Sequence, residues 1–179
     1  MASAQGPDAV WVFAYGSLMW RPDFAHQGSG PARLYGWHRA LCVLSTHYRG
    51  SPERPGLVLG LDRGGSCVGR VFRVAAADWA GVRAALHARE LRTGIYDPRF
   101  LPVRLEGGRV VPAYAFVVIR DHPQYWRGPA EGAVRLIRQG RGANGAARDY
   151  LASTLAQLEA LGVTDRGLRR LLRRVDGAV

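Results

Sequence analysis

The sequence contains no lysine, and all 25 of its basic residues are arginines. Against 14 acidic residues they give a formal net charge of +11. The arginines are spread along the whole chain rather than gathered into a tract, which favours a solvated basic surface over a nucleic-acid-binding face. Such a surface would still attract small anionic substrates, so we expect a small-molecule partner and no nucleic acid.

Long hydrophobic runs and cysteines are also scarce. No stretch approaches the ~20 consecutive apolar residues that a membrane-spanning helix needs. Residues 1–8 lack the basic flank and apolar run of a secretory signal peptide. Nothing in the pattern pairs the two cysteines, Cys42 and Cys67, as is usual in a reducing compartment. We therefore expect a cytoplasmic protein without a membrane partner.

Length and composition are ordinary for one globular domain. The 179 residues are 47% apolar and 22% charged, which excludes a disordered chain and leaves enough apolar material for one core. We expect a single domain over residues 1–179, of which residues 1–9 form a flexible N-terminal tail. Neither disulfides nor a structural metal should be needed for folding.

Hydrophobic patterning changes from strand-like to helical along the chain. Short apolar runs rich in β-forming residues predict strands at 10–15, 33–44, 57–61, 68–74, 101–105 and 110–119. A 3.6-residue period predicts helices at 78–93, 132–139, 146–161 and 164–175. Strands followed by helices indicate an α+β domain, with a compact mixed, mostly antiparallel, barrel-like sheet flanked by helices.

Glu90 is an acidic residue on an apolar helix face. The stripe runs through Trp79, Val82 and Leu86 at steps of three and four, and Glu90 is its next position. Burial there and the negative end of the helix dipole would both raise the pKa of its carboxyl, as general-base chemistry requires. The alternative is an internal ion pair with Arg89 or another arginine, and periodicity alone favours that alternative.

A second candidate site lies where the first predicted strand ends. Tyr15, Gly16 and Ser17 would present consecutive backbone N–H groups that can bind a carboxylate or an oxyanion. The segment lacks the pattern of a serine nucleophile elbow, a dinucleotide fingerprint or a P-loop. A plain β-turn is the simpler interpretation of these residues.

A metal site is not expected. His87 and Glu90 are three residues apart, and His38 and Cys42 are four apart, but neither pair has a second pair to complete a coordination shell.

Six segments, in this order, resemble the signatures of the ChaC-like γ-glutamylcyclotransferases. The resemblance as a whole covers residues from about 10 to about 175. Their order makes the match far more specific than any one segment would be. The segments are VFAYGSLMWRPDF (12–24), YGWHRALC (35–42), HYRGSPERPG (47–56), ARELRTGIY (88–96), RDHPQYWRGP (120–129) and GANGAARDYL (142–151).

The resemblance implies a barrel-like fold and a reaction that needs no cofactor and no metal. Glutathione would be converted to 5-oxoproline and cysteinylglycine by attack of its α-amine on the γ-amide. The catalytic glutamate of the family follows an arginine, which maps onto Glu90 after Arg89. Tyr150 is a further possible substrate contact, although a core aromatic is an equal alternative. The substrate-binding loop of the family maps onto Val12, Phe13, Ala14, Tyr15, Gly16 and Ser17.

Two departures from the family pattern bear on specificity. Ala14 stands where many members have glycine, and LRTGIY (91–96) replaces the Gly-Gly-Tyr of one branch by a form typical of the bacterial branch. One alternative is therefore a cyclotransferase for another γ-glutamyl amine or amino acid. Another, from a different class, is a non-catalytic regulatory or binding module that uses the basic surface.

Overall fold

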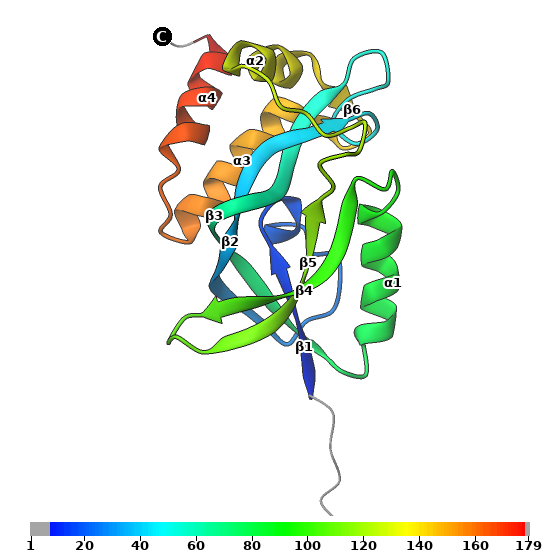
Figure 1. The fold of residues 1–179 in the computed structure, drawn as a ribbon, viewed down its shortest axis with the longest axis vertical. Coiled ribbons are helices and arrows are strands. Elements are labelled where there is room, and N and C mark those ends of the chain that lie inside the picture. Colours follow the sequence, from blue (N-terminus) through cyan, green and yellow to red (C-terminus); the bar gives the residue numbers. More distant parts are fainter. Residues whose placement is uncertain (1–7, 178–179) are drawn as a thin grey trace, which may run out of the picture.

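The computed structural model describes residues 8–177, and its centre is a closed five-stranded barrel (Figure 1). The strand order is β1-β3-β2-β4-β5, and β5 returns to pair with β1. That closing pair is parallel, whereas the other four are antiparallel. The predicted α+β class with a mixed, mostly antiparallel barrel is confirmed. The strands are β1 (Ala9–Ala14), β2 (Gly28–Ser45), β3 (Gly56–Ala75), β4 (Tyr96–Leu105) and β5 (Val110–Val118).

One pair of predicted strands is wrong. Residues 57–61 and 68–74 belong to the single strand β3, which pairs with β2 along most of its length. Gly64 and Gly65, with φ of +102° and +67°, lie at a break in the register of this pairing. A bulge of this kind bends a strand without ending it, so the glycines do not mark a boundary.

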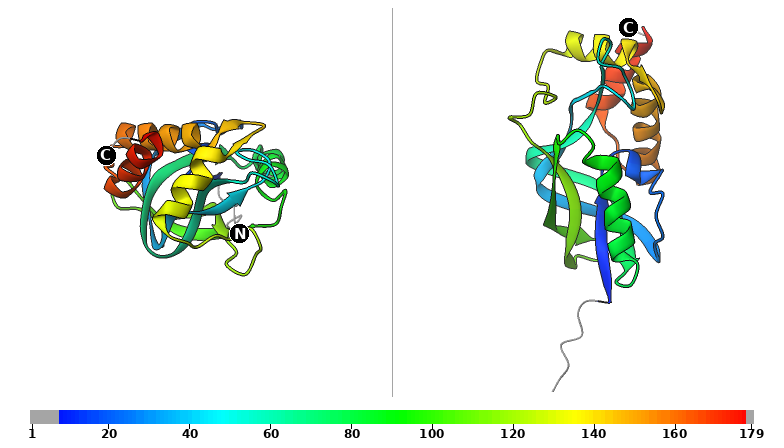
Figure 2. Two further views of the ribbon diagram at one scale, coloured as in Figure 1. Left: turned by 90° about the horizontal axis from the view of Figure 1, so that it is seen from above. Right: turned by 90° about the vertical axis from the view of Figure 1, so that its right-hand side faces the viewer.

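Helices cover the barrel on two sides (Figures 1 and 2). One helix, α1, lies along β1 and β5, while the other three pack together near one end of the barrel. All four predicted helices are present, with shifted ends. Two elements were not predicted as such, the 3-10 helix η1 (Ser17–Met19) and the hairpin β6 (Arg141–Gly142) and β7 (Gly145–Ala146). The helices are α1 (Trp79–Glu90), α2 (Ala130–Gln139), α3 (Ala147–Ala160) and α4 (Arg166–Asp176).

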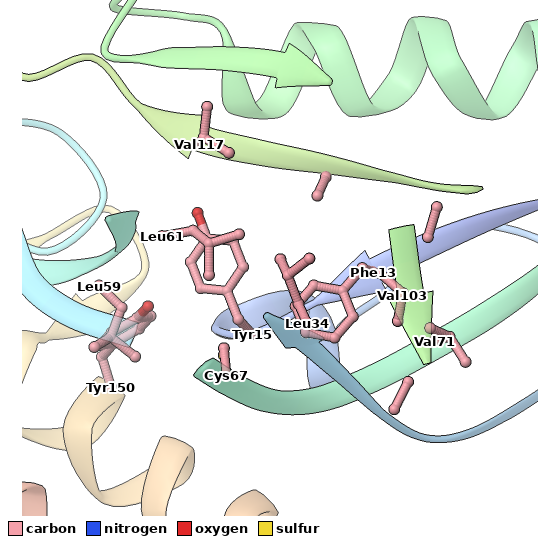
Figure 3. Close-up of a cluster of buried hydrophobic side chains, with 13 residues drawn as sticks. Phe13, Tyr15, Leu34, Leu59, Leu61, Cys67, Val71, Val103, Val117 and Tyr150 are labelled. Carbon is pink, nitrogen blue, oxygen red and sulfur yellow. The ribbon is translucent and has the colours of Figure 1, made fainter. Parts of the chain in front are cut away.

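Side chains alternate between two cores along β1 because successive strand residues point to opposite faces. Phe13 and Tyr15 point into the barrel, where Figure 3 shows them with Leu34 and other apolar side chains. Val12 and Ala14 point outward and pack with the apolar face of α1. The strand that leads to the Gly-Ser turn is therefore held from both sides.

The structure bears on the expected N-terminal tail and on the expected lack of a membrane-spanning helix. Residues 1–7 of the expected tail lie outside the described residues, but Ala9 already pairs with Ala75, so the tail does not extend to residue 9. No helix in residues 8–177 combines the length and the apolar character needed to cross a membrane.

The barrel interior should dominate stability. Leu34 is fully buried, so Leu34→Ala should lower the free energy of unfolding by about 2–5 kcal/mol. Val110 is 52% exposed, so Val110→Ala should change it by less than about 0.5 kcal/mol. Urea unfolding followed by circular dichroism measures both, and equal losses would contradict this assignment of the core.

Candidate active site

A cavity of about 240 Å³ opens at the end of the barrel where the first turn of α3 lies. Its lining includes the turn after β1, the last residues of α1, part of the loop 46–55 between β2 and β3, and the first turn of α3. The two predicted candidates, Glu90 and the segment Tyr15–Ser17, line the same cavity. The fold thus brings together residues that are more than 70 positions apart in the sequence.

Glu90 is the last residue of α1, and its side chain is only 18% exposed. Burial raises the pKa of its carboxyl, and the neighbouring guanidinium of Arg89, with Nε 3.1 Å from Oε1, lowers it again. The net pKa remains above the ordinary glutamate value. The two interpretations of Glu90, a tuned carboxylate and an internal ion pair, are therefore present together.

Arg89 also connects Glu90 to the Gly-Ser turn. Its guanidinium donates to Ser17 Oγ at 2.9 Å and to the carbonyl oxygen of Arg21 at 2.7 Å. A further contact, at 3.1 Å, goes to the carboxylate of Asp23. Asp23 has a φ of +53°, a left-handed conformation that is uncommon outside glycine. One side chain thus holds the acid at the end of α1 and the segment after β1 in a fixed relation.

The turn itself has unused hydrogen-bond donors. Within residues 8–177, the N–H groups of Gly16 and Ser17 donate to no other backbone or side-chain group. A Cβ added at Gly16 would lie 2.7 Å from the hydroxyl oxygen of Tyr150, closer than real Cβ contacts allow. Glycine is therefore required because the α3 tyrosine packs directly on the turn.

Among the tyrosines that line the cavity, Tyr15 and Tyr150 are buried and Tyr96 is partly buried. Tyr15 donates its hydroxyl proton to the carbonyl oxygen of Phe116 at 2.8 Å, and Tyr96 donates to that of Leu59 at 2.9 Å. Burial raises the pKa of Tyr15, Tyr96 and Tyr150, and the nearby carboxylate raises each further. All three hydroxyls stay protonated at neutral pH. The Glu90 carboxylate, rather than one of these tyrosines, can therefore accept a proton.

The other residues predicted for the substrate loop do not reach the cavity. Val12 and Ala14 pack against α1, and Phe13 fills the barrel interior, because the strand buries both of its faces here. Of the predicted loop, Tyr15, Gly16 and Ser17 line the cavity. Tyr150 belongs to the barrel core, as one of its two alternatives predicted, and it also lines the cavity, while its contact with a substrate stays a prediction (Figure 3).

Other cavity residues were not singled out from the sequence. Tyr48 and Arg49 come from the loop 46–55, and Asn144 comes from the turn between β6 and β7. The Tyr48 hydroxyl lies 3.4 Å from the carbonyl oxygen of Arg89, so the loop closes over the end of α1. The available signal was the segment HYRGSPERPG, whose resemblance to the family suggested no role for its individual residues.

The histidines considered for metal binding lie outside the cavity lining. His87 Nε2 is 2.5 Å from the hydroxyl oxygen of Tyr114, and His38 Nδ1 is 3.0 Å from the carbonyl oxygen of Gly64. Across residues 8–177, no three His, Cys, Asp or Glu side chains are grouped as metal ligands would be.

The fold matches solved structures. A structure described as a γ-glutamyl cyclotransferase specific to glutathione from yeast superposes with a TM-score of 0.86, covering 96% of this chain and 97% of the yeast chain at 21% identity. A structure described as a γ-glutamyl cyclotransferase superposes with a TM-score of 0.58 at 14% identity, covering 91% and 86% of the two chains. These likenesses establish the fold of the barrel.

Sequence relatives are closer. The chain is 37% identical to the glutathione-specific γ-glutamylcyclotransferase of Escherichia coli, over 94% of this chain and 72% of that protein. It is 34% identical to the human glutathione-specific γ-glutamylcyclotransferase 1, over 81% and 68% of the two chains. The family model described as ChaC-like protein matches residues 10–178. With its cavity, its Arg-Glu pair and its glycine-serine turn, the chain belongs to the ChaC-like protein family.

Proposed function

We propose that the protein is a glutathione-specific γ-glutamylcyclotransferase, which converts glutathione to 5-oxoproline and cysteinylglycine. The observation that carries this proposal is the buried carboxylate of Glu90, which shares one cavity with the free N–H groups of Gly16 and Ser17. The E. coli and human relatives named above support it, since both bear the name of this activity. The chemistry follows from what these groups can do to a γ-glutamyl amide.

Ring closure needs a folded substrate more than a strong nucleophile. The α-amine and the γ-carbonyl belong to the same glutamyl residue, so attack of one on the other forms a five-membered lactam. Holding the reacting atoms in contact can contribute about 7–11 kcal/mol to lowering the barrier. A cavity of about 240 Å³ that is lined by several distant parts of the chain favours such a bent conformer.

Glu90 moves the protons. The α-amine is an ammonium at neutral pH and cannot attack until the Glu90 carboxylate removes its proton. The nitrogen then forms a bond to the γ-carbon, and the carbonyl electrons move onto oxygen. When this oxyanion collapses, the bond to the cysteinyl nitrogen breaks, and protonated Glu90 gives its proton to the departing amine. The ring nitrogen still carries a second proton, which Glu90 takes and passes to the same amine, so that 5-oxoproline is left as a neutral lactam and cysteinylglycine departs as an ammonium. The raised pKa suits a group that must take and then give up a proton.

The turn stabilises negative charge. The N–H groups of Gly16 and Ser17 have no partner among the described residues, so they can donate to the oxyanion or to the α-carboxylate of the substrate. Ser17 is oriented by Arg89 and acts through its backbone rather than as a nucleophile. No step calls for a metal or an organic cofactor.

We place this activity in the cytoplasm. Cys42 and Cys67 are both free thiols and both buried, and burial raises the pKa of Cys42 to about 12. Unpaired thiols are usual in proteins of a reducing compartment, which is also where glutathione is kept reduced.

Removal of the base should abolish turnover without loss of the fold. Glu90→Gln should lower kcat for glutathione by about 10²–10⁴-fold, measured as release of 5-oxoproline and cysteinylglycine without added metal or nucleotide. Because the pKa of Glu90 is raised in the folded protein, ionising its carboxyl requires more free energy in the folded than in the unfolded chain. The free energy of unfolding therefore falls as the pH rises from the unfolded-state pKa through the folded-state pKa. The uncharged variant should therefore melt no lower than the parent at pH 7. Parent-like turnover by Glu90→Gln, or equal turnover of γ-glutamyl dipeptides and glutathione by the parent, would contradict the proposal.

The pH profile should report the balance between burial and Arg89. Since the base must be deprotonated, kcat/KM should fall on the acid side at a pH above the ordinary glutamate pKa of about 4.3. Arg89→Met removes the cation that lowers the pKa of Glu90, so this acid limb should move to higher pH. Arg83→Met, on an exposed position of the same helix, is the matched control. An acid limb that stays in place in Arg89→Met would refute the role of Arg89.

The contact between the turn and α3 can be tested by rescue. Gly16→Ala should lower kcat/KM at least tenfold, because its Cβ collides with the Tyr150 hydroxyl and displaces the turn by some tenths of an ångström. Tyr150→Phe removes the colliding oxygen, so Gly16→Ala/Tyr150→Phe should be more active than Gly16→Ala alone. Steady-state kinetics on the three variants decides this, and a double variant less active than both single ones would show that the collision is not the cause.

A further inference from the structure

Arg49 lies in the loop 46–55, whose backbone is tightly held. Its N–H donates to Ser45 Oγ at 3.0 Å. A Cβ added at Gly140 would lie 2.5 Å from the carbonyl oxygen of Arg49, and one added at Gly142 would lie 2.2 Å from that of His47. Only glycines allow these backbones to approach so closely. The loop therefore presents the Arg49 side chain to the cavity from a fixed position.

The guanidinium of Arg49 has no acidic partner in the described part of the chain. No carboxylate of residues 8–177 lies within 4.0 Å of it. Its one side-chain hydrogen bond there goes to the carbonyl oxygen of Ala146 at 3.2 Å, although a guanidinium has five N–H donors. Burial lowers the pKa of Arg49, and the positive charge of Arg21 acts in the same direction. This half-buried cation is suited to bind an anionic group of a ligand.

Tyr150 separates Arg49 from the reacting end of the cavity. The Tyr150 hydroxyl lies against Gly16, whereas its ring faces the Arg49 guanidinium at 5.6 Å from the ring centroid. If the glutamyl group lies between Glu90 and Gly16, the anion beyond the ring is the opposite end of the substrate. An α-linked tripeptide spans about 11 Å when fully extended, and the γ-linkage of glutathione lengthens its glutamyl residue further, so the far carboxylate can reach past one tyrosine ring.

We propose that Arg49 binds the glycyl carboxylate of glutathione. This inference rests on the proposed function and adds the means by which the site selects a tripeptide. A γ-glutamyl compound without that carboxylate leaves Arg49 unpaired in a partly buried position, so it is bound more weakly. The specificity of the cavity is thus set at the leaving end of the substrate, away from the atoms that react.

The test compares glutathione with its glycine amide, in which a neutral carboxamide replaces the glycyl carboxylate. In the parent protein, kcat/KM should be about tenfold to a hundredfold higher for glutathione, mainly through KM. Arg49→Met should lower kcat/KM for glutathione by a similar factor and lower that for the amide much less, so that the preference for glutathione is lost. Arg49→Lys, which keeps the charge but not the fork of donors, should retain part of the preference.

The matched control is Arg54→Met, an exposed position of the same loop outside the cavity lining, which should behave as the parent. Equal losses for both peptides in Arg49→Met would overturn the assignment, since Arg49 would then hold another part of the substrate or only the fold. An unchanged preference would overturn it too. Should Arg49→Met fail to fold, Arg49→Lys gives the same decision, because the preference must then fall below that of the parent.

The two proposals fail in different ways. If the parent turns over neither peptide, the proposed function is wrong. Calorimetric binding of both peptides to Glu90→Gln, with and without Arg49→Met, then judges Arg49 independently of turnover. Tighter binding of glutathione than of the amide, lost on Arg49→Met, supports the carboxylate contact, and equal binding of the two peptides rejects it. If the parent turns over glutathione but shows no preference for it over the amide, only the Arg49 assignment falls.

Discussion

The contact between Arg89 and Glu90 determines how the rest of the site can work. Burial alone raises the pKa of the carboxyl, and a fully compensating ion pair would return it to the ordinary glutamate value and make Glu90 a weaker base. The 3.1 Å contact offsets only part of the burial, so the pKa stays raised. Because the same guanidinium binds Ser17 and the carbonyl of Arg21, the electrostatic balance and the position of the turn depend on one side chain.

Periodicity was sufficient to predict the barrel class, the four helices and the unusual position of Glu90, because each is a local pattern of apolar and polar residues. It was not sufficient for β3, which was predicted as two strands because the polar and glycine-rich residues 62–67 interrupt the apolar pattern, although Gly64 and Gly65 form a bulge within one strand. Val12 and Ala14 could not be separated from the turn by pattern alone, since their burial against α1 depends on which helix covers the strand.

Arg49 shows the second limit of prediction from the sequence. Its place in the cavity depends on the contacts of Gly140 and Gly142 with the loop 46–55, about 90 residues earlier in the chain. No local propensity encodes such a contact between distant backbones. The composition gave no help either. All 25 basic residues are arginines and were interpreted together as a solvated basic surface, so no single arginine stood out as a ligand-binding residue.

The parallel pairing of β1 with β5 has a consequence for biosynthesis. β1 is made early, yet it meets its β5 neighbour only after about 100 further residues have been added. The cavity needs still more of the chain, because Tyr150 closes it. A nascent polypeptide that already contains Glu90 therefore lacks the complete cavity until Tyr150 and the first turn of α3 have also been synthesised. Such dependence on distant partners also favours slow folding.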